Sequence, residues 1–238
     1  MINVNDLKVK IFADGADKNG MLDMYKKSYI RGFTTNPTLM RRAGINNYQE
    51  FALEILRLIP DRPISLEVFS DEFDEMERQA KKISSWADNV YVKIPITNTK
   101  GKFSTQLIKN LTQANVKVNV TAMMTFEQLE KVLPSLEGSP GSYVSIFAGR
   151  VADTGINPLP IMKKSVEILK DYDNIELIWA SPRELYNIIQ ADEIGCHVIT
   201  VTNSILNKIS QLNKNLDQFS LETVQMFYND AQASGFNL

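Results

Sequence analysis

The sequence predicts an α/β protein with one closed (β/α)8 barrel of parallel strands and an additional helix at the C-terminal end. Short runs rich in β-branched residues recur every ~20–35 residues, the spacing that a strand, a loop and a crossover helix need. No Pro-, Gly- or Ser-rich linker and no change in charge pattern divides the 238 residues. We therefore expect a single barrel domain over residues 1–238. An open doubly wound sheet is the alternative, but such sheets usually have fewer strands.

The predicted strands are the eight runs that are most enriched in Val, Ile and aromatic residues. In chain order they are Val9–Asp14, Ile30–Thr34, Ile64–Phe69, Val90–Ile96, Val116–Ala122, Tyr143–Ala148, Ile175–Ala180 and His197–Thr202.

Helical periodicity fills the intervals between these runs. Phe73, Met76, Ala80 and Ile83 form a stripe with the spacing of a helix that lies on a sheet. The segment Thr125-Phe-Glu-Gln128 predicts a capping box at the start of another helix. Beyond the last strand, the amphipathic stretch Ser220–Ser234 predicts a further helix, which packs either on its own barrel or on a neighbouring molecule.

Composition excludes several classes of function. The formal net charge is −2, and the Lys and Arg residues are scattered, so neither nucleic acid nor an anionic membrane is an expected partner. The N-terminus has no basic region followed by an apolar run, and no apolar run reaches about 18 residues, so we expect a soluble, cytoplasmic protein. Cys196 and His197 are the sole residues of their types. We expect both to be core residues, and we expect no disulfide, metal or cofactor.

Strand parity places ionisable groups inside the barrel. Side chains alternate along a strand, so the aliphatic set Val90, Val92 and Ile94 faces the helices and Lys93 faces the interior. The same argument turns Asp14 and Glu67 inward. A buried ammonium group is costly unless it is paired, so Lys93 is either part of a structural ion cluster or a functional amine. We favour the functional amine, because burial disfavours the charged form and the neutral amine is the form that attacks a carbonyl.

Other strands turn polar or aromatic groups to the same axis. These are Asn119 and Thr121 on one strand and Ser145 and Phe147 on the next. A single Ser, Thr or Asn inside a barrel is more often a hydrogen-bonded structural residue than a catalytic one. Together, however, these groups lie near the carboxyl ends of their strands, where barrel enzymes build their active sites.

Two helix starts offer sites for an anion. Asn36-Pro37 predicts an N-cap followed by proline at the first helical position, and Ser181-Pro182-Arg183-Glu184 predicts a full capping box. A helix N-terminus also attracts anions, and Arg183 together with Arg150 supplies two guanidinium groups for a phosphate. The capping role and the ligand role are compatible.

With these residues identified, the chain resembles the transaldolase family. The matching segments, in chain order, are Ala13-Asp14-Gly15, Thr34-Thr35-Asn36-Pro37, Ser65-Leu66-Glu67-Val68, Val92-Lys93-Ile94-Pro95, Asn119-Val120-Thr121, Ser145-Ile146-Phe147-Ala148-Gly149-Arg150 and Ala180-Ser181-Pro182-Arg183. Each segment alone is weak evidence, but the whole series in order is specific. The resemblance implies a TIM barrel, no cofactor, and transfer of a three-carbon dihydroxyacetone unit between sugar phosphates in the pentose phosphate pathway. It also implies a homo-oligomer.

The resemblance implies a role for each matching position. Lys93 would be the Schiff-base nucleophile, Asp14 the acid and base for the substrate hydroxyl, and Glu67 and Thr121 the residues that hold a proton-shuttling water. The positions implied to bind substrate are Thr35, Asn36, Asn119, Ser145 and Phe147 around the ketol fragment, and Arg150, Ser181 and Arg183 at the phosphate.

Alternatives remain open at this point. The chain is as short as the compact members of the family, and some of these are fructose 6-phosphate aldolases, which typically carry Gln and Tyr where this chain has Glu67 and Phe147. A sulfonate could replace the phosphate at similar arginines. Other classes are a deoxyribose-phosphate-type aldolase, a barrel that carries pyridoxal phosphate on its lysine, and a barrel that binds sugar phosphate without turnover. The pairing of Asp14 with Asn36 argues against the first two, and an inward lysine with two carboxylates argues against the third.

Overall fold

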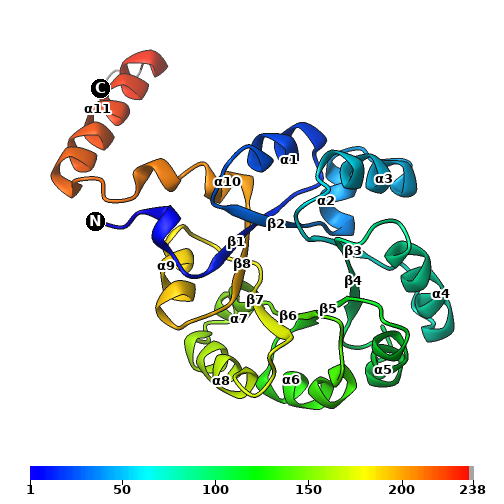
Figure 1. The fold of residues 1–238 in the computed structure, drawn as a ribbon. Helices are drawn as coiled ribbons and strands as arrows, with labels where there is room; N and C mark the ends of the chain where they lie inside the picture. The colour runs from blue at the N-terminus through cyan, green and yellow to red at the C-terminus, as the bar shows by residue number, and fades with distance from the viewer. Residues whose placement is uncertain (236–238) are drawn as a thin grey trace.

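The computed structural model describes residues 1–235 and forms a closed barrel whose eight parallel strands follow one another in chain order (Figure 1). The strands are β1 (Lys10–Asp14), β2 (Ile30–Thr34), β3 (Ile64–Glu67), β4 (Val90–Pro95), β5 (Val118–Met123), β6 (Ser142–Ile146), β7 (Ile175–Trp179) and β8 (Val198–Thr202). β1 pairs with both β2 and β8, which closes the ring. The predicted fold class is confirmed, and each predicted strand ends within a residue or two of an observed one.

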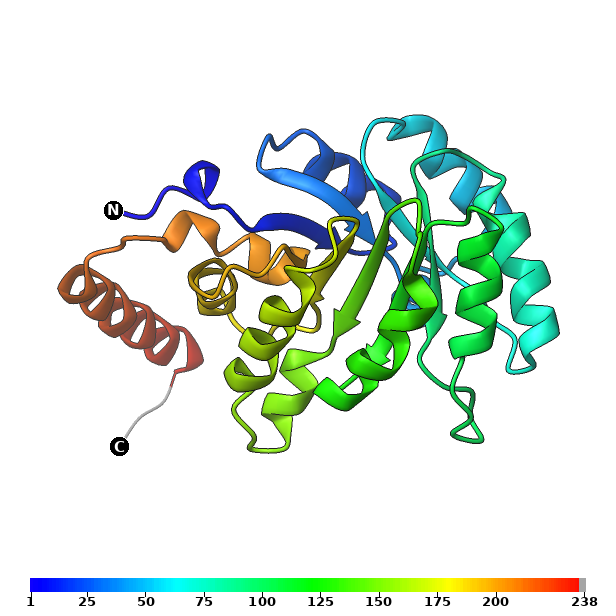
Figure 2. The same cartoon turned by 60° about the horizontal axis from the view of Figure 1, so that its bottom comes forward.

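The helices lie outside this barrel, and all but the last of them lie around it (Figures 1 and 2). They are α1 (Lys18–Tyr25), α2 (Pro37–Arg42), α3 (Tyr48–Leu58), α4 (Phe73–Ser84), α5 (Thr105–Gln113), α6 (Phe126–Val132), α7 (Ala148–Asp153), α8 (Leu159–Leu169), α9 (Tyr186–Glu193), α10 (Asn203–Leu206) and α11 (Leu216–Ser234), with short 3-10 turns at Val4–Asp6, Leu133–Leu136 and Ile209–Gln211. The predicted stripe lies on α4, where Met76, Ala80 and Ile83 are buried and Phe73 packs at the edge of the core. The predicted capping box at Thr125 and Gln128 is present at the start of α6.

Two apolar layers support the barrel. The larger one lies between the strands and the helices, and a separate cluster contains Phe12, Tyr143, Ile178 and Val198. Phe12 stands two residues before Asp14 and Tyr143 two before Ser145, so this cluster fills the amino half of the barrel interior. The rings of Phe12 and Tyr143 meet edge to face with 5.6 Å between their centroids. The cluster therefore forms an apolar floor below the polar groups at the carboxyl ends of the strands.

One residue of this floor must be glycine. A Cβ atom on Gly32 would lie 2.6 Å from the ring of Phe12. The absence of a side chain on β2 thus makes room for the phenylalanine that closes the lower half of the barrel.

The capping box predicted at Ser181-Pro182-Arg183-Glu184 is wrong. Helix α9 begins at Tyr186, and its N-cap Leu185 provides no side-chain hydrogen bond. Ser181 has a left-handed backbone with φ of 61°, whereas an N-cap has an extended backbone. The backbone N–H groups of Arg183 and Glu184 donate instead to Oδ1 of Asn187. The side chain of Asn187 therefore satisfies the donors that the sequence pattern had assigned to the serine.

The C-terminal helix α11 stands away from the barrel (Figures 1 and 2). It begins at Leu216, four residues before the predicted start, because Asn215 caps it by accepting a hydrogen bond from the Gln218 N–H. None of its residues is buried. Its exposed large apolar residues are Leu216, Phe219, Leu221, Val224, Met226, Phe227 and Tyr228. Of the two packing modes that the sequence left open, packing on its own barrel is therefore not observed.

Two further sequence predictions concern the core and the membrane. Cys196 is buried, and His197 is partly buried with its Nδ1 accepting a hydrogen bond from the Leu177 N–H. No helix within residues 1–235 combines the length and the apolar character needed to span a lipid bilayer.

Candidate active site

A cavity of about 500 Å³ opens at the carboxyl ends of the strands, and every strand or the residue that follows it contributes to the wall. Of the residues predicted from the sequence, the cavity brings together Asp14, Asn36, Glu67, Lys93, Asn119, Thr121, Ser145, Phe147, Arg150, Ser181 and Arg183. The inward-facing side chains of separate strands therefore meet in one site, as expected for a parallel barrel.

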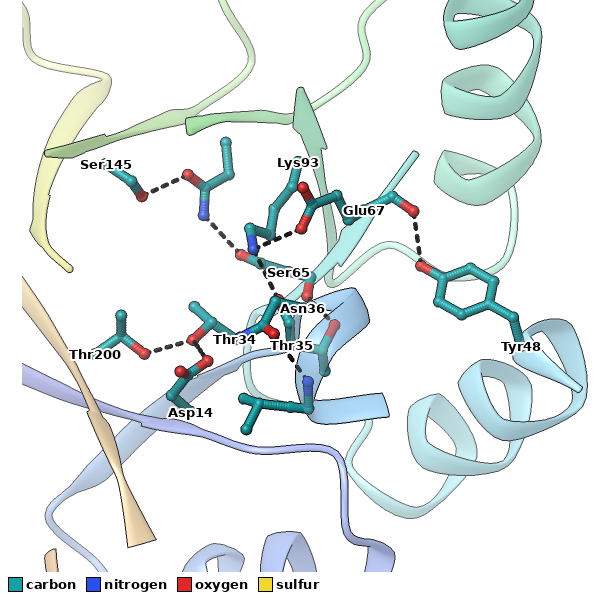
Figure 3. Close-up of polar contacts among 12 residues, drawn as sticks. Asp14, Thr34, Thr35, Asn36, Tyr48, Ser65, Glu67, Lys93, Ser145 and Thr200 are labelled. Atoms are coloured by element: carbon teal, nitrogen blue, oxygen red, sulfur yellow. Dashed lines mark hydrogen bonds and ion pairs between the residues drawn. The ribbon is translucent and has the colours of Figure 1, made fainter. Parts of the chain in front are cut away.

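Lys93 lies at the base of this cavity and is only 7% exposed. Its Nζ donates to Glu67 Oε2 at 2.9 Å and to the backbone carbonyl of Thr35 at 2.8 Å (Figure 3). Strand pairing places Glu67 directly beside Lys93, since these two residues are partners in the β3–β4 register. The amine is thus held by one carboxylate and one carbonyl, and it faces an open space that a carbonyl substrate can enter.

Thr35 is the one predicted site residue outside the cavity lining. It is fully buried, and its hydroxyl donates to the backbone carbonyl of Ser65 at 2.9 Å. Its own carbonyl accepts from Lys93, so Thr35 lies behind the amine and contributes its backbone to the orientation of Lys93 (Figure 3).

Asp14 faces the same space from β1 and belongs to a chain of hydroxyl groups (Figure 3). The hydroxyl of Thr34 donates to Asp14 Oδ1 at 2.7 Å and also contacts the hydroxyl of Thr200. Since the proton of Thr34 goes to the carboxylate, Thr200 must be the donor to Thr34. Burial raises the pKa of Asp14, while the charge of Lys93 and the Thr34 hydrogen bond offset part of this rise. A raised pKa suits a group that accepts and returns a proton near neutral pH.

This raised pKa predicts that Asp14→Asn makes the fold more stable. The folded state holds the Asp14 proton more tightly than the unfolded chain, so stability falls as pH rises from about 3.9 through the folded pKa. We expect the variant to have a higher Tm than the native protein, with a larger gain at pH 7 than at pH 4. Each kcal/mol corresponds to about 2–4 °C in a domain of this size.

Thermal unfolding at the two pH values measures this effect, with Asp23→Asn as the matched control. Asp23 is exposed and its pKa is lowered, chiefly by the hydrogen bond from Lys26, so its replacement should bring no gain at pH 7. A Tm gain for Asp14→Asn that is equal at both pH values would contradict the prediction.

A hydrogen-bonded row of side chains crosses the cavity next to Lys93. The hydroxyl of Ser145 donates to Asn119 Oδ1 at 2.7 Å, and Asn119 Nδ2 donates to the hydroxyl of Ser65 at 3.0 Å. All three residues are buried. This row fixes the amide of Asn119 so that the wall facing Lys93 presents polar groups in a defined orientation.

The hydroxyl of Thr121 is buried without a hydrogen-bond partner among the described residues. The next residue, Ala122, has a left-handed backbone with φ of 65°, and the pairing of β5 with β6 shifts between Val120 and Met123. Such a bulge changes the direction of side chains near functional sites. The role implied for Thr121, holding a proton-shuttling water, stays a prediction.

Asn36 caps a helix and also lines the cavity, so its position is compatible with both roles that the sequence allowed. Its Oδ1 accepts from the Leu39 N–H at 2.9 Å and caps α2, and Pro37 occupies the first turn. The same residue lines the cavity (Figure 3). The helix cap therefore holds this amide at the edge of the site.

The arginines predicted to bind an anion lie at the β6 and β7 side of the mouth. Arg183 forms a two-point ion pair with Asp153 through its Nε and Nη2 atoms. Arg150 is exposed, with its guanidinium carbon 5.8 Å from the centre of the Phe147 ring. The carboxylate of Asp153 has a lowered pKa because Arg183 donates to it, so it stays ionised and offsets the charge of Arg183.

A close backbone approach joins the two segments that carry these arginines. A Cβ atom on Gly149 of α7 would lie 1.5 Å from the carbonyl oxygen of Ser181. The left-handed backbone of Ser181 and the missing side chain of Gly149 therefore belong to one arrangement, which sets Arg183 beside Arg150 at the mouth of the cavity.

This contact predicts that Gly149→Ala displaces the Ser181 loop and weakens anion binding. We expect KM for phosphorylated substrates to rise about tenfold, the size of one charge-assisted contact, with a much smaller effect on unphosphorylated sugars. Steady-state kinetics with both kinds of sugar measure it. An unchanged KM for the phosphorylated sugar would mean that the loop tolerates the methyl group.

Several residues of the site are not among those predicted from the sequence. The side chains of Thr34, Thr200 and Ser65 also point into the barrel. The alternation of side chains along their strands is the signal that could have found them. Tyr48, whose hydroxyl donates to the backbone carbonyl of Glu67 at 3.1 Å (Figure 3), comes from a helix face and has no such signal. Arg42 on α2 also lines the cavity.

A comparison with family models decides the relationship of this chain to known proteins. The model described as Transaldolase/Fructose-6-phosphate aldolase matches residues 11–238. The chain belongs to this family. The probable transaldolase of Dehalococcoides mccartyi is 32% identical over 204 residues, which cover 85% of this chain and 91% of that protein. The probable transaldolase of Herpetosiphon aurantiacus is 30% identical over 222 residues, covering 92% and 96% of the two chains.

Solved structures agree on the fold at a much lower sequence identity. The 3-hexulose-6-phosphate synthase of Salmonella typhimurium superposes with a TM-score of 0.57 at 14% identity, covering 84% of this chain and 91% of that one. The enzyme called KGPDC from Streptococcus mutans gives a TM-score of 0.53 at 12% identity, with 84% and 90% coverage. At this identity the likeness extends to the barrel architecture alone.

Proposed function

We propose that this member of the family is a cytoplasmic transaldolase that uses Lys93 as its nucleophile. It takes a three-carbon dihydroxyacetone unit from a ketose phosphate such as fructose 6-phosphate or sedoheptulose 7-phosphate. It transfers this unit to an aldose phosphate, the exchange reaction of the pentose phosphate pathway. The observation that carries the proposal is the buried amine of Lys93 beside Glu67 and across from Asp14 in one polar cavity.

The first step is attack of the Lys93 amine on the C2 carbonyl of the ketose. The nitrogen forms a bond to C2, the oxygen leaves as water, and an iminium ion results. Glu67 and Thr121, which both line the cavity, hold the water that carries protons in this step. The polar row of Asn119 and Ser145, with Asn36 at the edge, binds the hydroxyl groups of the ketol fragment.

The second step breaks the C3–C4 bond. The Asp14 carboxylate takes the proton of the C4 hydroxyl, the C4–O bond becomes a carbonyl, and the electrons of the C3–C4 bond move into the iminium to give an enamine. The aldose phosphate leaves, and the enamine stays on Lys93 until an aldehyde acceptor arrives. The enamine then adds to the acceptor aldehyde by the reverse of these steps, and Asp14 returns its proton to the new hydroxyl group. The phosphate of the donor, and after it that of the acceptor, binds at Arg150, Ser181 and Arg183.

Borohydride trapping tests the proposed chemistry. Incubation with fructose 6-phosphate and borohydride should reduce the iminium and add the mass of the sugar fragment to the peptide that contains Lys93. Peptide mapping identifies the modified lysine. Absence of any sugar-dependent mass, or its presence on a different lysine, would overturn the proposal.

We also propose that the active protein is a homo-oligomer assembled through α11. The helix is detached from its own barrel, and its apolar residues are exposed, which is costly for an isolated chain in water. A second copy of the chain that buries this helix would remove that cost. Val224 and Phe227 are 61% and 63% exposed, so they are the residues to change.

The double variant Val224→Asp, Phe227→Asp is therefore expected to shift the protein from oligomer to monomer. Size-exclusion chromatography with light scattering gives the mass of each species. Gln225→Asp, which adds a charge at an exposed polar position of the same helix, should leave the oligomer intact. A native protein that is monomeric at micromolar concentration would contradict this proposal.

A further inference from the structure

Thr200 is a hydroxyl residue of the cavity that the proposed reaction does not use. It lies on β8, lines the cavity and is only 7% exposed. Strand pairing sets it beside Phe12 of the apolar floor, and Asp14 stands two residues further along β1. Val198, two residues before Thr200 on β8, also belongs to that floor. Thr200 therefore stands where the apolar floor meets the polar groups of the site.

A hydroxyl group at this boundary needs a partner. A valine would have nearly the same shape and would extend the floor, whereas a buried hydroxyl is costly unless it is hydrogen-bonded. Among the described residues, the partner of the Thr200 hydroxyl is the Thr34 hydroxyl, which donates to Asp14 Oδ1 at 2.7 Å (Figure 3). Thr200 is the donor in its bond to Thr34 while Asp14 is ionised. Because a hydroxyl that accepts a hydrogen bond is a stronger donor, Thr200 strengthens the bond from Thr34 to the carboxylate.

This chain gives the two carboxylate oxygens of Asp14 different surroundings. Oδ1 accepts from Thr34. Within residues 1–235, Oδ2 has no hydrogen-bond partner and is not among the buried unpartnered atoms, so it is open to the cavity that Asp14 lines. Oδ2 is therefore the oxygen left to take a proton from a ligand.

Burial disfavours the ionised form of Asp14 and raises its pKa more than any other influence. Lys93 and the Thr34 hydrogen bond lower this pKa, and Glu67 raises it. The elements β8 and α10, which pack against β1, have no charged residue. The remaining charged residues of β1, β2 and the cavity wall are Lys10, Arg31, Arg42, Arg150 and Arg183. The bond from Thr34 is thus one of two influences that favour the carboxylate, and it is the one that Thr200 reaches.

We propose that Thr200 is a positioning residue that acts on Asp14 through the Thr34 hydroxyl. It fixes which carboxylate oxygen meets the substrate, and it strengthens the hydrogen bond that favours the ionised base before proton transfer. After transfer, the bond from Thr34 goes to a neutral carboxyl group and is weaker, so the chain also favours return of the proton. This inference rests on the proposed function for the role of Asp14 as acid and base.

Titration of the Asp14 carboxyl group by carbon NMR tests the chain without any substrate. Asp14→Asn identifies its signal in protein labelled at the Asp carboxyl carbon. In Thr200→Val the midpoint should rise by roughly 0.3–1 pH unit, because the bond that favours the ionised form is weakened. Thr200→Ser keeps the hydroxyl and should titrate like the native protein. Thr112→Val is the matched control, because it removes a buried hydroxyl that does not line the cavity, and it should leave the midpoint unchanged.

A double substitution tests whether Thr200 acts through Thr34. Thr34→Val removes the direct bond and should raise the Asp14 midpoint more than Thr200→Val does. Adding Thr200→Val to Thr34→Val should then change nothing further, because the connection to Asp14 is already lost. A further rise in the double variant would mean that Thr200 acts on Asp14 by another route, which would overturn the inference. Thermal unfolding establishes that each variant is folded.

Activity links the chain to the reaction. The acid limb of the kcat/KM profile for fructose 6-phosphate, with erythrose 4-phosphate as acceptor, should move to higher pH in Thr200→Val by the same amount as the NMR midpoint. An unchanged midpoint in Thr200→Val, or an equal rise in Thr200→Ser, would overturn the inference. A shifted midpoint with an unshifted kcat/KM profile would refute the catalytic part of it. If the native protein gives no borohydride trapping, the proposed function fails separately, and the NMR titration still decides whether Thr200 acts on Asp14.

Discussion

Replacing Lys93 with alanine should lower the transfer rate by about 10⁴-fold or more and abolish borohydride trapping, while the protein stays folded. The rate depends on the iminium as an electron sink, and no other amine lines the cavity within residues 1–235. Removing one partner of a buried ion pair usually destabilises a fold, because a charge is left without a partner. Here the side chain of Glu67 is 19% exposed and faces the cavity, so water can enter and solvate it.

Lys100→Ala is the matched control for this variant. Lys100 is an exposed lysine whose ion pair with Glu72 lies on the surface, so its loss should change neither turnover nor trapping. Circular dichroism and thermal unfolding establish that Lys93→Ala is folded. Normal turnover by folded Lys93→Ala, or sugar-dependent trapping on another lysine in that variant, would exclude the mechanism.

The barrel and most of the candidate site follow from the sequence because both depend on the alternation of side chains along a strand, in which every second residue faces the same side. A strand that buries its aliphatic set against the helices must turn the intervening residues inward, and no tertiary detail alters this alternation. Asp14, Lys93 and Ser145 are therefore placed correctly by parity alone. Parity does not separate a hydroxyl that contacts the ligand from one that supports it, which is why Thr34 and Thr200 were not distinguished from structural residues.

The parts that the sequence did not predict depend on contacts between distant segments. The left-handed turn at Ser181 is coupled to the close approach of Gly149 and to the Asn187 side chain, none of which a local capping pattern contains. Thr35 belongs to the matching motif, yet its hydroxyl is turned to the Ser65 backbone, and only its carbonyl reaches Lys93. A position in a motif thus indicates proximity to the site but not which atom of the residue is used.

Phe147 bears on whether the protein transfers its enamine or releases it. An aldolase protonates the enamine on the lysine and hydrolyses it, whereas a transaldolase keeps it until an aldehyde arrives. Retention requires that no well-placed proton donor meets the reactive carbon. The ring of Phe147 lines the cavity and has no group that can donate a proton, while a tyrosine at the same position would carry a hydroxyl into that space.

We therefore expect fructose 6-phosphate alone to give little free dihydroxyacetone, and erythrose 4-phosphate to start rapid formation of sedoheptulose 7-phosphate. In Phe147→Tyr, the release of dihydroxyacetone without acceptor should rise about a hundredfold, since a positioned general acid typically contributes 10²–10⁴-fold. Phe147→Leu is the control, because it removes the ring without adding a donor and should not raise release. The measurement is free dihydroxyacetone with and without acceptor for all three proteins. Fast release by the native protein without acceptor would make it an aldolase, and an equal rise in both variants would assign the effect to lost packing at Phe147.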